Sequence, residues 1–121
     1  MNLGIVGSRI FNDYTLLKTA TLNILAEEEI SIADVNTFIS GGAKGADFLG
    51  LKFATEHKIP KIIIHKPEWE KYGKSAGHIR NVFIVEDSDL IIAFWDGKSK
   101  GTKNTIELCK RREKNLYIIN F

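Results

Sequence analysis

Apolar residues gather in five short runs along the chain, and each run is rich in isoleucine and valine. The runs show little alternation between apolar and polar positions, which is typical of strands that are covered on both faces. They span Leu3–Val6, Val35–Ile39, Lys61–Ile64, Leu90–Phe94 and Leu116–Ile119. We therefore predict five short, buried strands.

Between these runs lie segments whose apolar residues recur with helical spacing. The predicted helices span Thr15–Glu29, Ala46–His57, Ile79–Glu86 and Thr102–Arg112. Asp13 and Thr15 are the candidates for capping the first of them. Because strands alternate with helices, we predict an α/β fold: a Rossmann-like three-layer α/β/α sandwich with a five-stranded, mostly parallel sheet.

Length and composition fit one folded domain. The chain has 121 residues, of which 44% are apolar and 26% charged, so we expect a single domain over residues 1–121. The lone Cys109 excludes an internal disulfide and a cysteine-based zinc cluster. No apolar run reaches the roughly 18 residues of a membrane span, and the first residues lack a signal-peptide core. We expect a cytoplasmic protein with no membrane partner.

The charge balance gives only weak support for a nucleic-acid partner. Lys and Arg number 17 against 15 Asp and Glu, for a net charge of +2. The distribution is uneven, because Lys98–Lys114 holds seven basic and two acidic residues. This cluster is either a solvated helix face, which we favour, or a surface that attracts anionic ligands.

The loops that follow the first two strands hold candidate anion-binding residues, since ligands of such sheets bind at the carboxyl ends of strands. Arg9 can hold a phosphate through two N–H groups. Segment Ser40–Asp47 has three glycines before a predicted helix start, where free N–H groups favour phosphate. It matches neither a P-loop nor the dinucleotide fingerprint. Asp47 accepts hydrogen bonds either from amides or from a ribose hydroxyl. The candidates are Gly7, Ser8, Arg9, Ser40, Gly41, Gly42, Ala43, Gly45 and Asp47.

The loops after the third and fourth strands supply the other candidates. Residues 65–81 form the longest stretch without periodicity, and such loops are usually functional. Trp69 either stacks on a base or covers the edge of the core, and we favour the core. Beyond Asp96, small residues open the last helix as a second anion nest. These candidates are Trp69, Arg80, Asn81, Asp96, Gly97, Ser99, Gly101 and Thr102. The histidines lack metal-site spacing, so we predict no metal and no cofactor.

Four blocks of sequence, in order, resemble the YspA-like branch of the SLOG superfamily, which is related to the DNA-processing protein Smf/DprA and to Lonely Guy phosphoribohydrolases. The blocks are G-S-R-x-F from Gly7, S-G-G-A-x-G-A-D from Ser40, W-x-K-x-G-K-x-A-G-x-x-R-N from Trp69 and A-F-W-D-G-x-S-x-G-T-x-x-T-I from Ala93. The resemblance implies a Rossmann-like fold, a nucleotide-like ligand and self-association. We therefore expect a small-molecule partner and a homo-oligomer.

The resemblance also allows the motifs of the Lonely Guy hydrolases to be compared with this sequence. Lonely Guy enzymes carry P-G-G-x-G-T-x-x-E, and here the glutamate position holds Thr105. Glu107 lies about 200° further round a helix, so it cannot simply substitute. The upstream M-H-x-R-K motif is echoed at Gly77–Asn81, where Arg80 matches. The candidate catalytic residues are Arg80, Asp47, Asp96 and Glu107.

Three functions fit these observations. We favour a protein that binds a nucleotide or nucleotide-derived ligand, as a sensor in stress or phage-defence signalling. The alternative is a phosphoribohydrolase or N-glycosidase that acts on a nucleoside monophosphate, so whether the chain is an enzyme stays open. The second alternative is single-stranded nucleic-acid binding, with charge from the last helix and stacking from Trp69, Tyr72 and Trp95. The small net charge places nucleic acid last among the expected partners.

Overall fold

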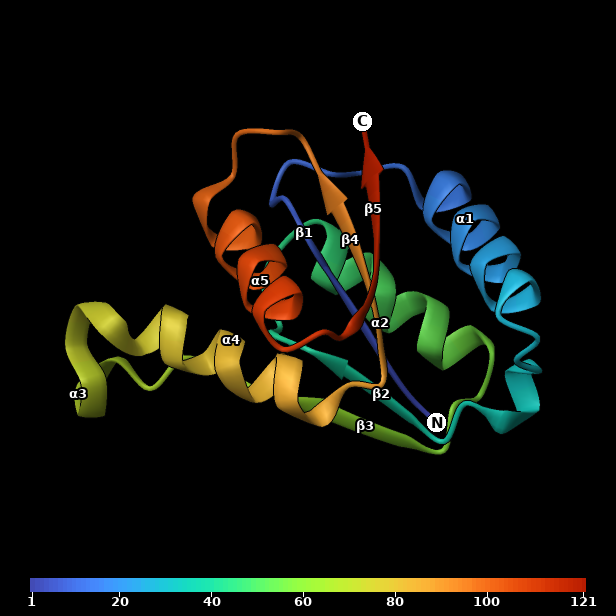
Figure 1. Ribbon diagram of the computed structural model, residues 1–121, viewed down its shortest axis with the longest axis horizontal. Coiled ribbons are helices and arrows are strands. Elements are labelled where there is room, and N and C mark those ends of the chain that lie inside the picture. The colour runs from blue at the N-terminus through green and yellow to red at the C-terminus, as the bar shows by residue number, and fades with distance from the viewer.

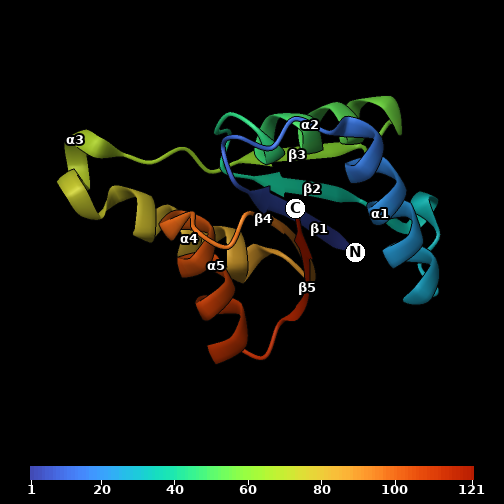
Figure 2. The same ribbon diagram turned by 90° about the horizontal axis from the view of Figure 1, so that it is seen from above.

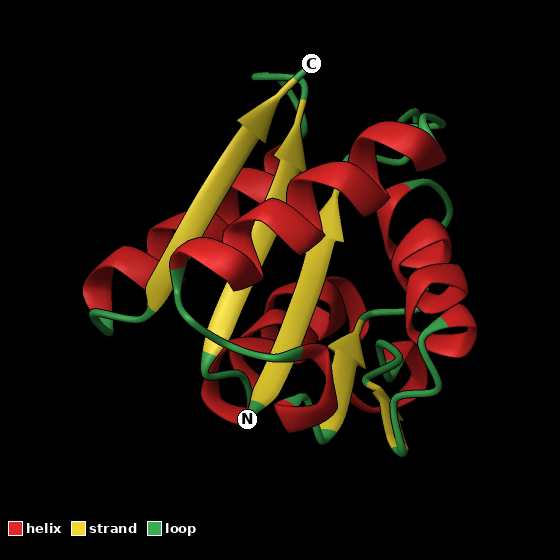
Figure 3. Cartoon of the chain, turned by 90° about the vertical axis from the view of Figure 1, so that its right-hand side faces the viewer, coloured by secondary structure: helices red, strands yellow, loops and turns green.

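The five predicted strands form one sheet in the computed structural model, which describes residues 1–121 (Figure 1). They are β1 (Asn2–Gly7), β2 (Thr37–Ser40), β3 (Lys61–Ile64), β4 (Leu90–Trp95) and β5 (Asn115–Asn120). Every neighbouring pair is parallel, in the order β3-β2-β1-β4-β5 (Figure 3). The predicted Rossmann-like fold is confirmed, with a sheet that is wholly parallel.

Helices cover both faces of the sheet and make the three layers visible in Figure 2. One face carries α1 (Tyr14–Glu27) and α2 (Ala46–Glu56), and the other carries α4 (Ala76–Asp87) and α5 (Lys100–Arg111). Leu3 and Ile5 of β1 pack in one core, while Val6 packs in the other. Because both faces are buried, the strands show no alternation in sequence. None of the helices has the length and apolar character needed to cross a membrane.

Several boundaries differ from the prediction, and local hydrogen bonds explain two of them. The second strand begins at Thr37 and not at Val35, because Ile32–Asp34 forms a 3₁₀ turn that Ser31 caps through a 3.3 Å hydrogen bond from Ala33 N. Helix α1 begins at Tyr14 and not at Thr15. Asp13, one of the two predicted cap candidates, caps it through Oδ1, which accepts a 3.0 Å hydrogen bond from Leu16 N. Hydrogen bonds from backbone amides to side-chain oxygens thus determine where these segments begin.

The long stretch after β3 is more structured than predicted. It contains the short helix α3 (Trp69–Tyr72) and a 3₁₀ turn over Gly73–Ser75, which runs directly into α4 at Ala76. In Figures 1 and 2 this segment projects from the end of the molecule, away from the sheet. Its first residue, Trp69, is therefore held at the rim of the fold.

Candidate functional site

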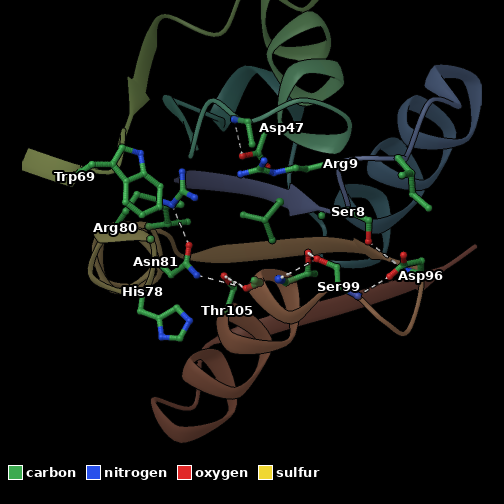
Figure 4. Close-up of a pocket in the computed structure, with 18 residues that line it drawn as sticks. Ser8, Arg9, Asp47, Trp69, His78, Arg80, Asn81, Asp96, Ser99 and Thr105 are labelled. Atoms are coloured by element: carbon green, nitrogen blue, oxygen red, sulfur yellow. Dashed lines mark hydrogen bonds between the residues drawn. The ribbon is translucent and has the colours of Figure 1, made fainter. Parts of the chain in front are cut away.

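A cleft of about 450 Å³ opens at the carboxyl end of the sheet (Figure 4). It lies where the strand order reverses, because β1 is flanked by β2 on one side and by β4 on the other. Helices α2, α4 and α5 all have first-turn residues in its lining, namely Asp47, Gly77 and Gly101. Three helix N-termini, with the positive ends of their dipoles, make this a favourable place for an anion.

The loop after β1 lies at the centre of the cleft. A side chain at Gly7 would overlap the carbonyl oxygen of Phe94, so glycine is required there. Ser8 is buried, and its Oγ accepts a 3.2 Å hydrogen bond from the Asp96 amide. Ser8 therefore joins the loops after β1 and β4. Arg9 is exposed and extends toward Asp47 (Figure 4).

Asp47 is a buried carboxylate at the start of α2, with only 6% of its surface exposed. Its Oδ2 accepts a 3.1 Å hydrogen bond from Ala43 N. Burial raises the pKa of Asp47 to about 6, although the Ala43 amide and the charge of Arg80 act in the opposite direction. The sequence left two roles open for Asp47, which could accept hydrogen bonds from amides or from a ribose hydroxyl. The structure shows Asp47 as an acceptor from an amide.

Arg80 is half-buried and connects the glycine-rich loop to α4. Its Nη1 donates a 2.7 Å hydrogen bond to the Gly41 carbonyl, and its Nε donates a 3.0 Å bond to Asn81 Oδ1. A Cβ at Gly41 would overlap this guanidinium. Burial lowers the pKa of Arg80 and Asp47 opposes that shift. The guanidinium is thus fixed in place, while its Nη2 group makes no hydrogen bond within the protein.

Asn81 links two of the helices that open on the cleft. Its side chain is buried, and Nδ2 donates a 3.0 Å hydrogen bond to Asn104 Oδ1 and a 3.4 Å bond to the Gly101 carbonyl. The sequence marked Asn81 as a ligand-binding residue. In the structure, these bonds fix the start of α4 against the start of α5.

The second anion nest is partly filled by the protein's own carboxylate. Asp96 Oδ1 accepts hydrogen bonds from Lys98 N at 2.9 Å and from Ser99 N at 2.8 Å, which lower the pKa of Asp96. Ser99 caps α5 through a 3.5 Å bond from the Thr102 amide. The amides of Lys100 and Gly101 donate to no protein group, so they remain for a ligand. This nest and the one after β2 are separated by β1.

The prediction that Trp69 covers the edge of the core is wrong. The side chain is 56% exposed and lies at the rim of the cleft beside Arg80 (Figure 4). It is placed there because α3 projects from the fold and Gly77 leaves room beneath the ring. An aromatic surface and a cation therefore stand together at the mouth of the cleft.

The other predicted residues divide between the cleft, a neighbouring hollow and the outer surface. Those in the cleft are Gly7, Ser8, Arg9, Ala43, Asp47, Trp69, Arg80, Asn81, Asp96, Ser99, Gly101 and Thr102. Gly41 and Gly42 line an adjoining hollow of about 320 Å³ that shares Arg9, Ala43, Trp69 and Arg80 with the cleft. Outside both are Ser40, Gly45, Gly97 and Glu107.

Several residues in the cleft were not singled out by the sequence. They are Val6, Ile10, Gly77, His78, Ile84 and Thr105. Gly77 and His78 belong to a block that the resemblance did quote. Thr105, at the glutamate position of the Lonely Guy motif, is buried, and its hydroxyl donates a 3.3 Å hydrogen bond to the Gly101 carbonyl. The only carboxylates in the lining are those of Asp47 and Asp96.

Comparison with known proteins gives the chain a family. No family model matches it. The gene 61 protein of Mycobacterium phage D29 is 30% identical over 124 residues, which cover 97% of this chain and 93% of the phage protein. The chain belongs to the gene 61 protein family. The two proteins thus match over nearly their full lengths.

A solved structure shows the same fold as this gene 61 family chain. It is the DNA processing protein A of Helicobacter pylori, described for its single-stranded DNA binding mode, with a TM-score of 0.66 and 21% identity over 98% of this chain. The chain spans only 64% of the length of that structure. The ligand of this neighbour contradicts the expected partner set, in which a small molecule was favoured over nucleic acid. A net charge of +2 averages over the whole surface, so it does not by itself rank nucleic acid below a small molecule.

Proposed function

We propose that this chain binds single-stranded DNA in the cleft at the carboxyl end of its sheet. The observation that carries the proposal is the exposed Trp69 beside Arg9 and Arg80, above three helix N-termini. An aromatic platform combined with a cationic groove is the usual means of holding a strand without reading its sequence. The likeness in fold to DNA processing protein A, described for its single-stranded DNA binding, supports the same ligand.

The lining of the cleft supports a strand over an isolated small molecule. The free amides of Lys100 and Gly101 suit a phosphate. The cleft also continues past Arg9 and Arg80 into the hollow beside Gly41. This extended track suits a nucleotide that is one unit of a longer chain.

The same site supports a finer classification. The four sequence blocks that resemble the YspA-like branch of the SLOG superfamily supply the loops around the cleft. We propose that the gene 61 family belongs near that branch and that residues 1–121 act as one DNA-binding domain. Its place of action is then the cytoplasm, where single-stranded DNA arises during replication and repair.

The test is fluorescence anisotropy with a labelled oligothymidine of about 20 nucleotides and with a duplex of equal length. We expect the single strand to bind more tightly, with an affinity that falls as salt rises. Trp69→Ala should weaken binding by about 5- to 150-fold, since stacking is worth about 1–3 kcal/mol per base. Arg9→Gln should lower the salt slope by about 0.7, the value for one phosphate contact on a single strand.

Two matched variants control for surface changes elsewhere. Phe48→Ala removes an aromatic side chain that is 63% exposed on α2 and outside the cleft. Lys18→Gln removes an exposed cation on α1, outside the cleft and the adjoining hollow. Both should bind like the wild type. The proposal fails if the wild type does not bind the strand, or if Trp69→Ala and Phe48→Ala lose the same affinity.

A further inference from the structure

A separate hollow of about 340 Å³ lies between the end of β3, α3 and α4, on the far side of Arg80 from the cleft. We infer that it receives a nucleobase of the bound strand, an inference that rests on the proposed DNA-binding function. We call it the base pocket and define it by its apolar walls, Ile64, Tyr72, Ile79 and Phe83. Figure 2 shows the chain leaving β3 toward α3 and returning through α4.

The walls of the base pocket suit a flat aromatic ring. Phe83 is 43% exposed, which is unusual for a phenylalanine within a helix that packs on the sheet. Its ring lies 5.8 Å from the ring of His65, with an angle of 30° between the planes. His65 is itself held by Asp87, with 2.6 Å between Nε2 and Oδ2. Phe83 and His65 thus form a fixed aromatic wall with nothing stacked against it.

The charges around the pocket indicate a base and not a phosphate. Arg80 lines the cleft, the hollow beside Gly41 and the base pocket, and Lys66 lines the last two. Because both cations are shared between the base pocket and the hollow beside Gly41, a backbone that runs between the two has phosphate partners at their boundary. Glu68, also in the lining, would repel a phosphate inside the pocket. Its carboxylate can instead accept a hydrogen bond from the amino group of cytosine, adenine or guanine.

The cleft and the two hollows are continuous with one another, and this continuity defines a path for the strand. Trp69 lines the cleft and the hollow beside Gly41, while Tyr72, one turn along α3, lines the base pocket. Two consecutive stretches of strand can therefore place bases on opposite sides of Arg80, one on Trp69 and one on Phe83. The volume of about 340 Å³ lies within the range of about 300–1,000 Å³ of pockets that hold small organic molecules.

The experiment compares two strands and two variants. The probes are an oligodeoxycytidine and an abasic strand of equal length, which keeps the phosphates and lacks the bases. Phe83→Ala should weaken binding of the oligodeoxycytidine by about 5- to 150-fold and leave binding of the abasic strand unchanged. Phe83→Leu, which keeps apolar bulk and removes the ring, should show most of the same loss. Phe48→Ala is the exposed-aromatic control and should behave as the wild type.

The outcomes separate this inference from the function on which it rests. If the wild type binds neither strand, single-stranded DNA binding is refuted and the base pocket with it. If the wild type binds and Phe83→Ala loses equal affinity for both strands, or loses none, the base pocket is refuted while DNA binding stands. Circular dichroism melting of each variant shows whether the fold is retained. Unchanged binding of the abasic strand provides a second check that the variant is folded.

Discussion

Replacing Asp47 by asparagine removes a buried charge while keeping the shape of the side chain. The folded pKa of Asp47 is raised from 3.8 to about 6, mainly because burial disfavours the charged form. The folded state therefore binds this proton more tightly than the unfolded state. The contribution of Asp47 to stability is then fully present below the ordinary pKa and is lost as pH rises through the folded one.

The size of this effect follows from the shift. A difference of about two pKa units corresponds to about 3 kcal/mol, at 1.36 kcal/mol per unit. Asparagine resembles the neutral acid and can still accept the hydrogen bond from Ala43 N. Asp47→Asn should thus match the wild type near pH 4 and become more stable by up to about 3 kcal/mol above about pH 7.

The assay is urea unfolding followed by tryptophan fluorescence, with both proteins measured at several values from about pH 4 to pH 8. Every other titrating group is common to the two proteins, so the difference in free energy of unfolding isolates Asp47. A difference that stays constant over this range would refute the buried, penalised carboxylate. A wild type that gains stability relative to the variant as pH rises would refute it equally.

Other perturbations test the site and its supports. Gly41→Ala places a methyl group against the Arg80 guanidinium, so single-stranded DNA affinity should fall several-fold in the anisotropy assay; an unchanged affinity would mean that Arg80 makes no contact with the strand. Ser99→Ala removes the cap of α5 and should lower the free energy of unfolding by about 1 kcal/mol in urea. Asn81→Leu leaves the half-buried Asn104 Oδ1 without its 3.0 Å partner and should lower the free energy of unfolding by about 1 kcal/mol; an unperturbed urea midpoint would contradict this.

The strands and their layers were predictable because burial on both faces leaves a direct trace in the sequence. Runs such as Leu90–Phe94 have no polar alternation, and β4 is indeed covered by a helical layer on each side. The edge strand β5 is only half-buried, yet its apolar run is long enough to be recognised. The position of β1 at the centre is a matter of long-range pairing, which local pattern does not encode.

Segment 65–75 was missed for the opposite reason. Helix α3 has four residues, too few for a helical period to be read. The exposure of Trp69 depends on how far this segment projects from the sheet, and composition alone favours burial for tryptophan. A side chain at the tip of a short projecting element is thus beyond what periodicity can place.

The site was predictable as loops and less so as contacts. Glycine-rich stretches marked where the backbone approaches closely, and Gly41 does make room for Arg80. Residue types did not reveal that Asp96 already binds the amides of its own loop. Helical spacing did place Glu107 away from Thr105, and Glu107 lies outside the cleft. The angle between two residues around one helix can be worked out from the sequence, whereas contacts between loops can be seen only in the folded structure.

Because the walls of the cleft come from segments near residues 8, 45, 80 and 100, the site is assembled from four separate βα connections. No fragment of the chain contains it, and every strand pair in the sheet joins segments that are distant in sequence. Binding is therefore coupled to folding of the entire domain. A strand present at about 100 times its Kd would stabilise the whole fold by about 2.7 kcal/mol. Thermal unfolding of the intact chain becomes a direct measure of what occupies the cleft.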